Sequence, residues 1–203
     1  SLGEWALRAA CEEAAQWDED VNISVNVSPI QIKRPGWEGS VIAIVEETGL
    51  APERLMIEVT ESVLMTDSAQ VLDRLQRLQD YGISIALDDF GTGYSSLSYL
   101  RKFRFDKLKI DKSFMRESED VVCAAIIRCI VRLGRQLSVL VVAEGIETER
   151  QLKMIEQEGC THVQGYFFAK PMNASAAREY MSAAAGRHLA LPTPEAPLLL
   201  KSA

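Results

Sequence analysis

Acidic, amide and basic side chains recur at the ends of short apolar runs in this chain, and their types suit chemistry on a charged substrate. The runs over residues 22–27, 83–88 and 107–111 alternate apolar and polar residues with the two-residue period of a β-strand. The last polar residue of each run lies on the face opposite the apolar side chains. In chain order these terminal residues are Asn26, Glu58, Asp88, Lys109, Glu144 and Gln164. Polar groups at so many strand ends indicate one assembled site, since solubility alone rarely produces that register.

The charges of this set predict a metal centre. Glu58, Asp88, Asp89 and Glu144 carry four negative charges, and Lys109 brings the sum to −3. Carboxylate oxygens favour Mg²⁺ or Mn²⁺ over Zn²⁺, and two histidines in the whole chain exclude zinc sites built on several imidazoles. Two divalent ions would bring the sum to +1, and ions about 3.5–4 Å apart are typical of phosphoester cleavage. We expect Asp88 to bridge both ions and Asp89 to reach one.

The surrounding sequence predicts the elements that position these groups. The capping-box spacings of Asp67 with Gln70 and of Thr148 with Gln151 mark two helix starts. The alternation of strand and helix patterns predicts a parallel sheet wrapped by helices. Strands are expected over residues 21–28, 55–61, 83–89, 107–111, 139–144 and 161–166. Helices are expected over residues 4–17, 41–47, 69–80, 95–101, 120–137, 149–158 and 174–184.

The predicted strands are strongly apolar on one face only, which favours a barrel. In the third strand, Ile83, Ile85 and Leu87 share a face. An open doubly wound sheet needs apolar residues on both faces, whereas a barrel meets helices only on its outside. We therefore predict an α/β fold, a TIM-like (β/α)8 barrel represented by six β/α units with the first two strands missing. The barrel domain is expected over residues 1–185, and residues 186–203, with three prolines in six residues, form a flexible tail or linker.

Composition and charge exclude several classes of partner. The chain has 203 residues, with 22 basic and 29 acidic side chains and a net charge of −7. Because no Lys/Arg run exists, we expect no DNA or RNA polymer as a partner. No apolar run is long enough to span a bilayer and no signal peptide is visible, so we expect a cytoplasmic domain without membrane contact. The four cysteines lack metal-binding spacing and are expected to be small buried side chains.

Six segments together resemble the signature series of EAL domains, bacterial phosphodiesterases that hydrolyse cyclic di-GMP. They are residues 26–29, 57–62, 88–96, 109–111, 143–147 and 164–166. The resemblance implies hydrolysis of cyclic di-GMP to linear pGpG with two Mg²⁺ or Mn²⁺ ions per site. It also implies a homodimer and attachment to upstream sensory or GGDEF domains. The Glu-Ala-Leu motif that names the family, and the substrate-binding arginine after it, would lie on the missing strands. If the protein lacks those strands, weak or no turnover is expected; the intact protein can equally contain them.

The resemblance assigns metal ligands by position. Asn26, Glu58 and Asp88 correspond to ligands of the first ion, and Asp88 and Asp89 to ligands of the second. Glu144 also corresponds to a metal ligand. Asn26 and Asp88, together with Gln164, are further expected to contact the substrate.

Catalytic roles follow from the same resemblance. Glu144 corresponds to the proposed general base, Lys109 to the lysine that holds and polarises the attacking water, and Gln164 to a residue that positions this water. Glu61 corresponds to the glutamate that stabilises the loop over residues 90–96, which resembles the segment linking the metal site to the family's dimer interface.

Plainer interpretations of several residues remain open at this point. Lys109 is also explained by a structural ion pair inside the barrel, and His162 by a satisfied core position rather than a metal ligand. Glu147 competes with Glu144 for the role of base, but it falls in the loop after the strand. Trp5 and Trp17 are expected to pack in the core.

Two other functions also fit the sequence. A receptor module that binds cyclic di-GMP without cleaving it would retain the binding groups but has no need of Lys109 or Glu144. An enolase-like barrel would use the same carboxylates with Mg²⁺ and a lysine base, and would leave phosphodiesters intact.

Overall fold

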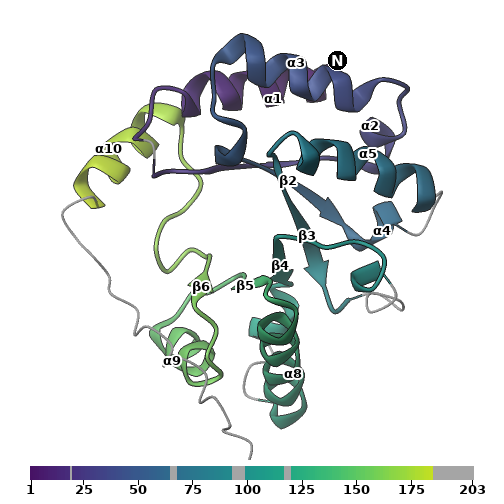
Figure 1. Cartoon of the computed structure of the whole chain (residues 1–203). Helices are drawn as coiled ribbons and strands as arrows, with labels where there is room; N and C mark the ends of the chain where they lie inside the picture. Colours follow the sequence, from purple (N-terminus) through teal and green to yellow (C-terminus); the bar gives the residue numbers. More distant parts are fainter. Residues whose placement is uncertain (19, 65–67, 93–98, 117–119, 185–203) are drawn as a thin grey trace, which may run out of the picture. The chain divides into compact units, whose positions relative to one another are not determined.

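The computed structural model describes residues 1–18, 20–64, 68–92, 99–116 and 120–184, which are drawn in colour in Figure 1. The chain divides into two compact units, Ser1–Lys170 and Pro171–Ala203. The second unit contains α10 (Ala174–Ala184), where Asn173 Oδ1 accepts a hydrogen bond from the Ala176 N–H at 2.9 Å and so caps the helix start. The predicted tail over residues 186–203 lies outside the described residues.

The first unit is built on one sheet of parallel strands, as the sequence predicts. Its six described strands lie in the order β1-β2-β3-β4-β5-β6, so each strand pairs with its neighbours in sequence. Such an order, with a helix crossover between successive strands, is the arrangement of a TIM-like barrel wall. The strands are β1 (Ile23–Asn26), β2 (Leu55–Thr60), β3 (Ser84–Phe90), β4 (Lys107–Ile110), β5 (Leu140–Ala143) and β6 (His162–Val163).

Helices cover one face of this sheet. α1 packs against α3 and β1, α5 packs against β3, and α8 packs against β4 and β5. Figure 1 shows α1 and α3 side by side near the start of the sheet and α8 and α9 near its other end. The longer helices of this unit are α1 (Leu2–Ala14), α3 (Trp37–Thr48), α5 (Ser68–Asp80), α8 (Val121–Leu137) and α9 (Glu149–Gln157). Single-turn helices are α2 (Pro29–Ile32), α4 (Glu61–Leu64) and α7 (Ser113–Arg116), and Pro52–Arg54 form a 3₁₀ turn.

The two faces of the sheet differ in chemistry. The helix-covered face is apolar and closed to solvent: Ile57, Ile85 and Leu108 are fully buried in the hydrophobic core. Burying each such side chain contributes roughly 1.5–3 kcal/mol. The opposite face carries the polar residues between them, because side chains alternate along a strand. The fold is therefore α/β, a curled half-barrel whose polar concave face is held by an apolar outer layer.

Several local predictions are wrong. Trp5 is 67% exposed rather than buried, because it lies on the outer side of α1. Trp17, in contrast, is partly buried and packs against the core as expected. His162 is exposed on β6, and in the described residues this strand pairs with β5 alone. Gln164 lies directly after β6 rather than within it, since the strand ends at Val163.

The helix starts are partly as predicted. Thr148 and Gln151 form the expected capping box at the start of α9. Asp67 and the greater part of the helix expected over residues 95–101 lie outside the described residues. The short helices α2, α4 and α7 directly after strands were not predicted, because four apolar-periodic residues are too few to show a helical pattern. No described helix combines the length and apolarity that crossing a bilayer requires.

Candidate active site

Lys109 on β4 contacts three carboxylates, one from β2, one from β3 and one from the residue directly after β5. Its ammonium nitrogen lies 2.5 Å from Glu58 Oε2, 2.6 Å from Glu144 Oε1 and 3.2 Å from Asp88 Oδ1. Lys109, Glu58 and Asp88 are buried, with 4%, 5% and 8% of their surface exposed. A lysine has three N–H donors, so this arrangement offers each carboxylate one donor.

The parallel register explains why these side chains meet. Glu58 pairs with Ala86, and Asp88 follows two residues later on the same face of β3. Lys109 pairs with Val142 on β5, and Glu144 follows Val142 by two residues. The carboxyl ends of parallel strands thus deliver their last polar side chains to one edge of the barrel wall, as they do in TIM-barrel sites.

A β-bulge turns two consecutive aspartates toward the same site. The pairing of β3 with β4 shifts between Leu87 and Phe90, and Asp89 has a φ of +55°, in the left-handed region. Aspartate enters this region more readily than most residues, and bulges next to active sites redirect side chains. The Asp89 N–H donates to Asp88 Oδ1 at 3.0 Å, which fixes the first carboxylate.

Asp88, Asp89 and Glu144 form a cluster suited to a divalent cation. One carboxylate oxygen from each lies within 4.8 Å of the other two. Three hard oxygen donors fit Mg²⁺ or Mn²⁺, and the described cluster contains no thiolate or imidazole that would favour zinc. These oxygen donors therefore fit the predicted type of metal. Glu58 is not part of this cluster but pairs with Lys109, which also contacts Asp88 and Glu144.

Burial and charge shift the ionisation of these groups. Burial raises the pKa of Glu144, although the hydrogen bond and charge of Lys109 oppose the shift. Burial likewise raises the pKa of Asp89, reinforced by the charges of Asp88 and Asp111. Burial alone would lower the pKa of Lys109, but its hydrogen bonds to Glu144 and Glu58 raise it above the ordinary value. Lys109 is therefore a fixed cation at neutral pH and not a base.

The other predicted residues lie around this cluster. Asn26 pairs in register with Glu58 at the end of β1, with its side chain exposed. Gln164 is also exposed, and its N–H donates to Ala143 O, one residue before Glu144. Within the described part of the chain, neither side chain hydrogen-bonds to the carboxylates of the cluster.

Two further glutamates, Glu61 and Glu147, lie outside the carboxylate cluster. Glu61 Oε1 accepts from the Gly91 N–H at 3.1 Å, which ties the start of α4 to the segment after β3. Most of the loop over residues 90–96 lies outside the described residues. Glu147 is exposed in the loop after β5. Of the two glutamates, Glu144 is the one that pairs with Lys109.

Two residues beyond the predicted set, Asp111 and Gln151, contact the site or the segments that carry it. The charge of Asp111 contributes to the raised pKa of Asp89. Burial would raise the pKa of Asp111 itself, but hydrogen bonds from Ser113 and Lys112 lower it. Gln151 was recognised as a helix cap, but its side chain also reaches Met115 O at 3.0 Å. Asp111 could have been found from the sequence, because it follows Lys109 by two residues and so shares its face of the strand.

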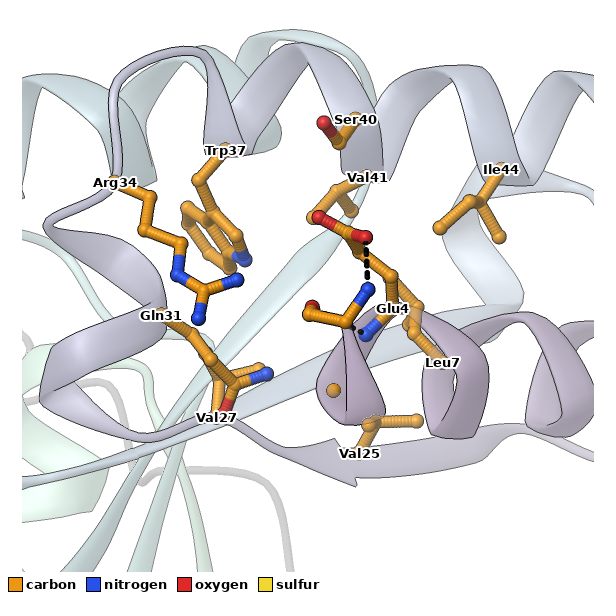
Figure 2. Close-up of a pocket in the computed structure, with 12 residues that line it drawn as sticks. Glu4, Leu7, Val25, Val27, Gln31, Arg34, Trp37, Ser40, Val41 and Ile44 are labelled. Carbon is orange, nitrogen blue, oxygen red and sulfur yellow. Dashed lines mark hydrogen bonds and ion pairs between the residues drawn. The ribbon is translucent and has the colours of Figure 1, made fainter.

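A separate cavity lies on the other face of the wall. Figure 2 shows it between α1, β1 and α3, with Leu7, Val27, Trp37 and Val41 among its lining residues. Its free space is about 10 Å³, which is room for about one water molecule. This cavity is too small for a substrate, and it opens among core side chains rather than at the strand ends.

Comparison with known proteins identifies a family model and relatives that match most of this chain. The EAL domain family model matches residues 1–171. The bifunctional diguanylate cyclase/cyclic di-GMP phosphodiesterase MucR of Pseudomonas aeruginosa is 42% identical over 178 residues, covering 85% of this chain and 26% of that protein. The chain spans about a fifth to a quarter of the length of the curated relatives it matches.

Solved structures show the same fold. The MucR phosphodiesterase in complex with c-di-GMP superposes with a TM-score of 0.83 at 41% identity, covering 87% of this chain and 73% of that one. The EAL domain of Mycobacterium smegmatis DcpA gives 0.85 at 36% identity, covering 90% and 84%. A manganese/cyclic di-GMP complex of Klebsiella pneumoniae BlrP1 gives 0.78 at 31% identity, covering 84% and 44%. The enolase-like alternative is therefore wrong, and this chain belongs to the EAL domain family.

Proposed function

We propose that this domain hydrolyses one phosphodiester bond of cyclic di-GMP and releases linear pGpG, with Mg²⁺ or Mn²⁺ held by the carboxylate cluster. The observation that carries the proposal is the convergence of Asp88, Asp89 and Glu144 within 4.8 Å beside the buried Lys109. The names of MucR and of the BlrP1 complex, which include cyclic di-GMP and manganese, support the choice of substrate and metal.

The metal ligands in this proposal are Asp88 and Asp89, with Glu144 closing the cluster and Asn26 and Glu58 flanking it. When bound, divalent cations would neutralise charge on the phosphate and make a water molecule a better nucleophile. We place two ions at this site, because the four acidic groups otherwise repel an anionic substrate.

The protein's own side chains then perform the proton transfer. Glu144 accepts a proton from the attacking water, a role that its raised pKa favours. The water oxygen forms a bond to phosphorus, the bond from phosphorus to the ribose oxygen breaks, and that oxygen leaves with the proton that Glu144 accepted from the water. Lys109 stays protonated and donates hydrogen bonds that orient the water and the carboxylates. Gln164 and Asn26, exposed at the ends of the two outermost described strands, bind the substrate.

We further propose that the domain acts as a homodimer within a longer signalling protein. The support is the resemblance of residues 90–96 to the family's interface loop and the second activity in the name of MucR. Sedimentation of the purified chain at several concentrations tests the dimer.

Incubation of the chain with cyclic di-GMP and Mn²⁺, followed by chromatography, tests the reaction. The assay includes the chain extended at its N-terminus by two β/α units, about 60 residues, taken from MucR, to supply a full set of eight strands. We expect pGpG from the extended form, and Glu144→Gln should abolish turnover while leaving cyclic di-GMP binding intact. Glu147→Gln is the matched control and should remain active. Binding without any product would show that the domain is a receptor rather than an enzyme.

A further inference from the structure

The loop that carries Glu144 is packed tightly against the turn after β4. The Glu144 N–H donates to Ile110 O at 3.1 Å, one residue beyond Lys109. Gly145 has a φ of +71°, and a Cβ at this position would lie 2.5 Å from Cβ of Lys112. The carboxylate of Glu144 is therefore placed by the way in which its loop joins the turn after β4.

Gln151, in the first turn of α9, joins the same two segments through its side chain. Its Oε1 accepts from the N–H groups of Glu147 and Thr148 at 2.8 and 3.0 Å. Its Nε2 donates to the backbone oxygen of Met115 at 3.0 Å. Met115 is fully buried in α7, which begins three residues after β4 ends. One amide thus bridges the chain that follows Glu144 and the chain that follows Lys109.

The cap alone does not require an amide at this position. A capping box accepts glutamate or glutamine at the third helical residue, because only an oxygen acceptor is needed. The bond to Met115 O requires a donor, and a carboxylate has none. A glutamate in place of Gln151 would keep the cap and turn an oxygen toward the Met115 carbonyl. The bridge and the cap are therefore separable by substitution.

We propose that Gln151 is a positioning residue that sets the place of the Glu144 carboxylate relative to Lys109 and to the oxygens of Asp88 and Asp89. Its effect on rate rests on the proposed phosphodiesterase function, whereas its effect on cation binding does not. Gln151 acts through the backbone on either side of the site and does not contact the substrate. Small displacements of a reacting group, of about 1 Å, cost up to roughly 100-fold in rate.

Two variants separate positioning from helix stability. Thr148→Ala removes the hydroxyl that accepts from the Gln151 N–H at 3.3 Å, so it weakens the start of α9 and leaves the bridge to Met115 intact. Gln151→Glu keeps the acceptor for the cap and removes the bridge. The purified chain is measured for its thermal midpoint and for Mn²⁺ affinity by titration calorimetry. The same variants of the N-terminally extended form are measured for kcat and KM with cyclic di-GMP.

We expect Thr148→Ala to lower the thermal midpoint while Mn²⁺ affinity and kcat stay within about twofold of wild type. Gln151→Glu should weaken Mn²⁺ binding about fivefold or more and lower kcat about tenfold, with KM unchanged. In a Glu144→Gln background, Gln151→Glu should cause no further loss of Mn²⁺ affinity, because the group that it positions is already altered.

Wild-type Mn²⁺ affinity and kcat in Gln151→Glu would overturn the inference. Losses that follow the thermal midpoint equally in both variants would also overturn it, since they would show a structural role alone. If the wild-type chain and its extended form both bind Mn²⁺ but release no pGpG, the proposed phosphodiesterase function is wrong. The Mn²⁺ affinities of the two variants then still decide the inference.

Discussion

The ammonium nitrogen of Lys109 lies 2.6 Å from Oε1 of Glu144, the residue directly after the neighbouring strand β5. The same nitrogen also contacts Glu58 and Asp88, so a single buried cation holds carboxylates from three other strand ends. Because like charges at these distances repel, the carboxylates stay together only with a cation among them. Lys109 is thus the residue on which the geometry of the proposed site depends.

Replacing this cation should destabilise the fold. We expect Lys109→Met to lower the free energy of unfolding by about 3–5 kcal/mol, because it leaves buried carboxylates without a partner. Urea unfolding of the chelator-treated protein measures the loss. Lys153→Met is the matched control: Lys153 pairs with Glu149 at 2.7 Å on the surface of α9, and its removal should change stability little. Equal stability of the two variants would contradict the account.

The bond between Glu61 and Gly91 should matter for rate more than for cation binding. Glu61→Ala leaves the Gly91 N–H without the acceptor at 3.1 Å and releases the segment that follows β3. We expect turnover of cyclic di-GMP to fall about tenfold while Mn²⁺ affinity stays near wild type. Glu61→Gln keeps an acceptor oxygen and should retain most of the rate. If the alanine variant turned over at the wild-type rate, the loop-stabilising role would be wrong.

Cation binding should weaken as the pH falls, and at a higher pH than for ordinary carboxylates. The pKa values of Asp89 and Glu144 are raised, chiefly by burial. As the pH falls, protons therefore compete with the cation for these oxygens at a higher pH than the one at which an exposed aspartate is protonated. Calorimetric titrations with Mn²⁺ from roughly pH 8 to pH 5 should show this decline. Affinity that is constant across this range would exclude the two carboxylates as ligands.

Stability of the chelator-treated protein should change in the opposite direction. A carboxyl whose pKa is raised by folding binds more protons in the folded than in the unfolded state, between its ordinary and its raised value. The contribution of Asp89 and Glu144 to the free energy of unfolding therefore increases as the pH falls through that window. The same urea measurements at each pH test the sign.

The layout of the fold was predictable because it depends on local patterns. Alternation along residues 83–89 predicts a strand with one apolar face, and Ile85 and Leu87 are indeed fully buried. The strand ends also predicted that Asp88 and Lys109 would share one edge, since parallel strands end together. The prediction that Trp5 is buried was wrong, because an amphipathic pattern does not show how wide the covered face of a helix is.

The finer geometry of the site was not predictable from the sequence. The bulge that turns Asp89 toward Asp88 depends on the register between β3 and β4, which single-strand patterns do not contain. The triple ion pair of Lys109 depends on the lateral distance between strands, and the bond from Gln151 to Met115 joins residues 36 positions apart. Such contacts arise from tertiary packing, so residue types indicate the members of a site but not their partners.

The central claim, that Asp88, Asp89 and Glu144 together hold a divalent cation, is tested most directly by calorimetric titration of Mn²⁺ into the chelator-treated chain. The account predicts saturable binding in wild type and an affinity at least about tenfold weaker in Asp88→Asn, because a buried carboxylate ligand is lost. Asp73→Asn, which alters an exposed aspartate paired with Arg77 on α5, should bind as wild type does. Equal Mn²⁺ affinity in wild type and Asp88→Asn would contradict the account.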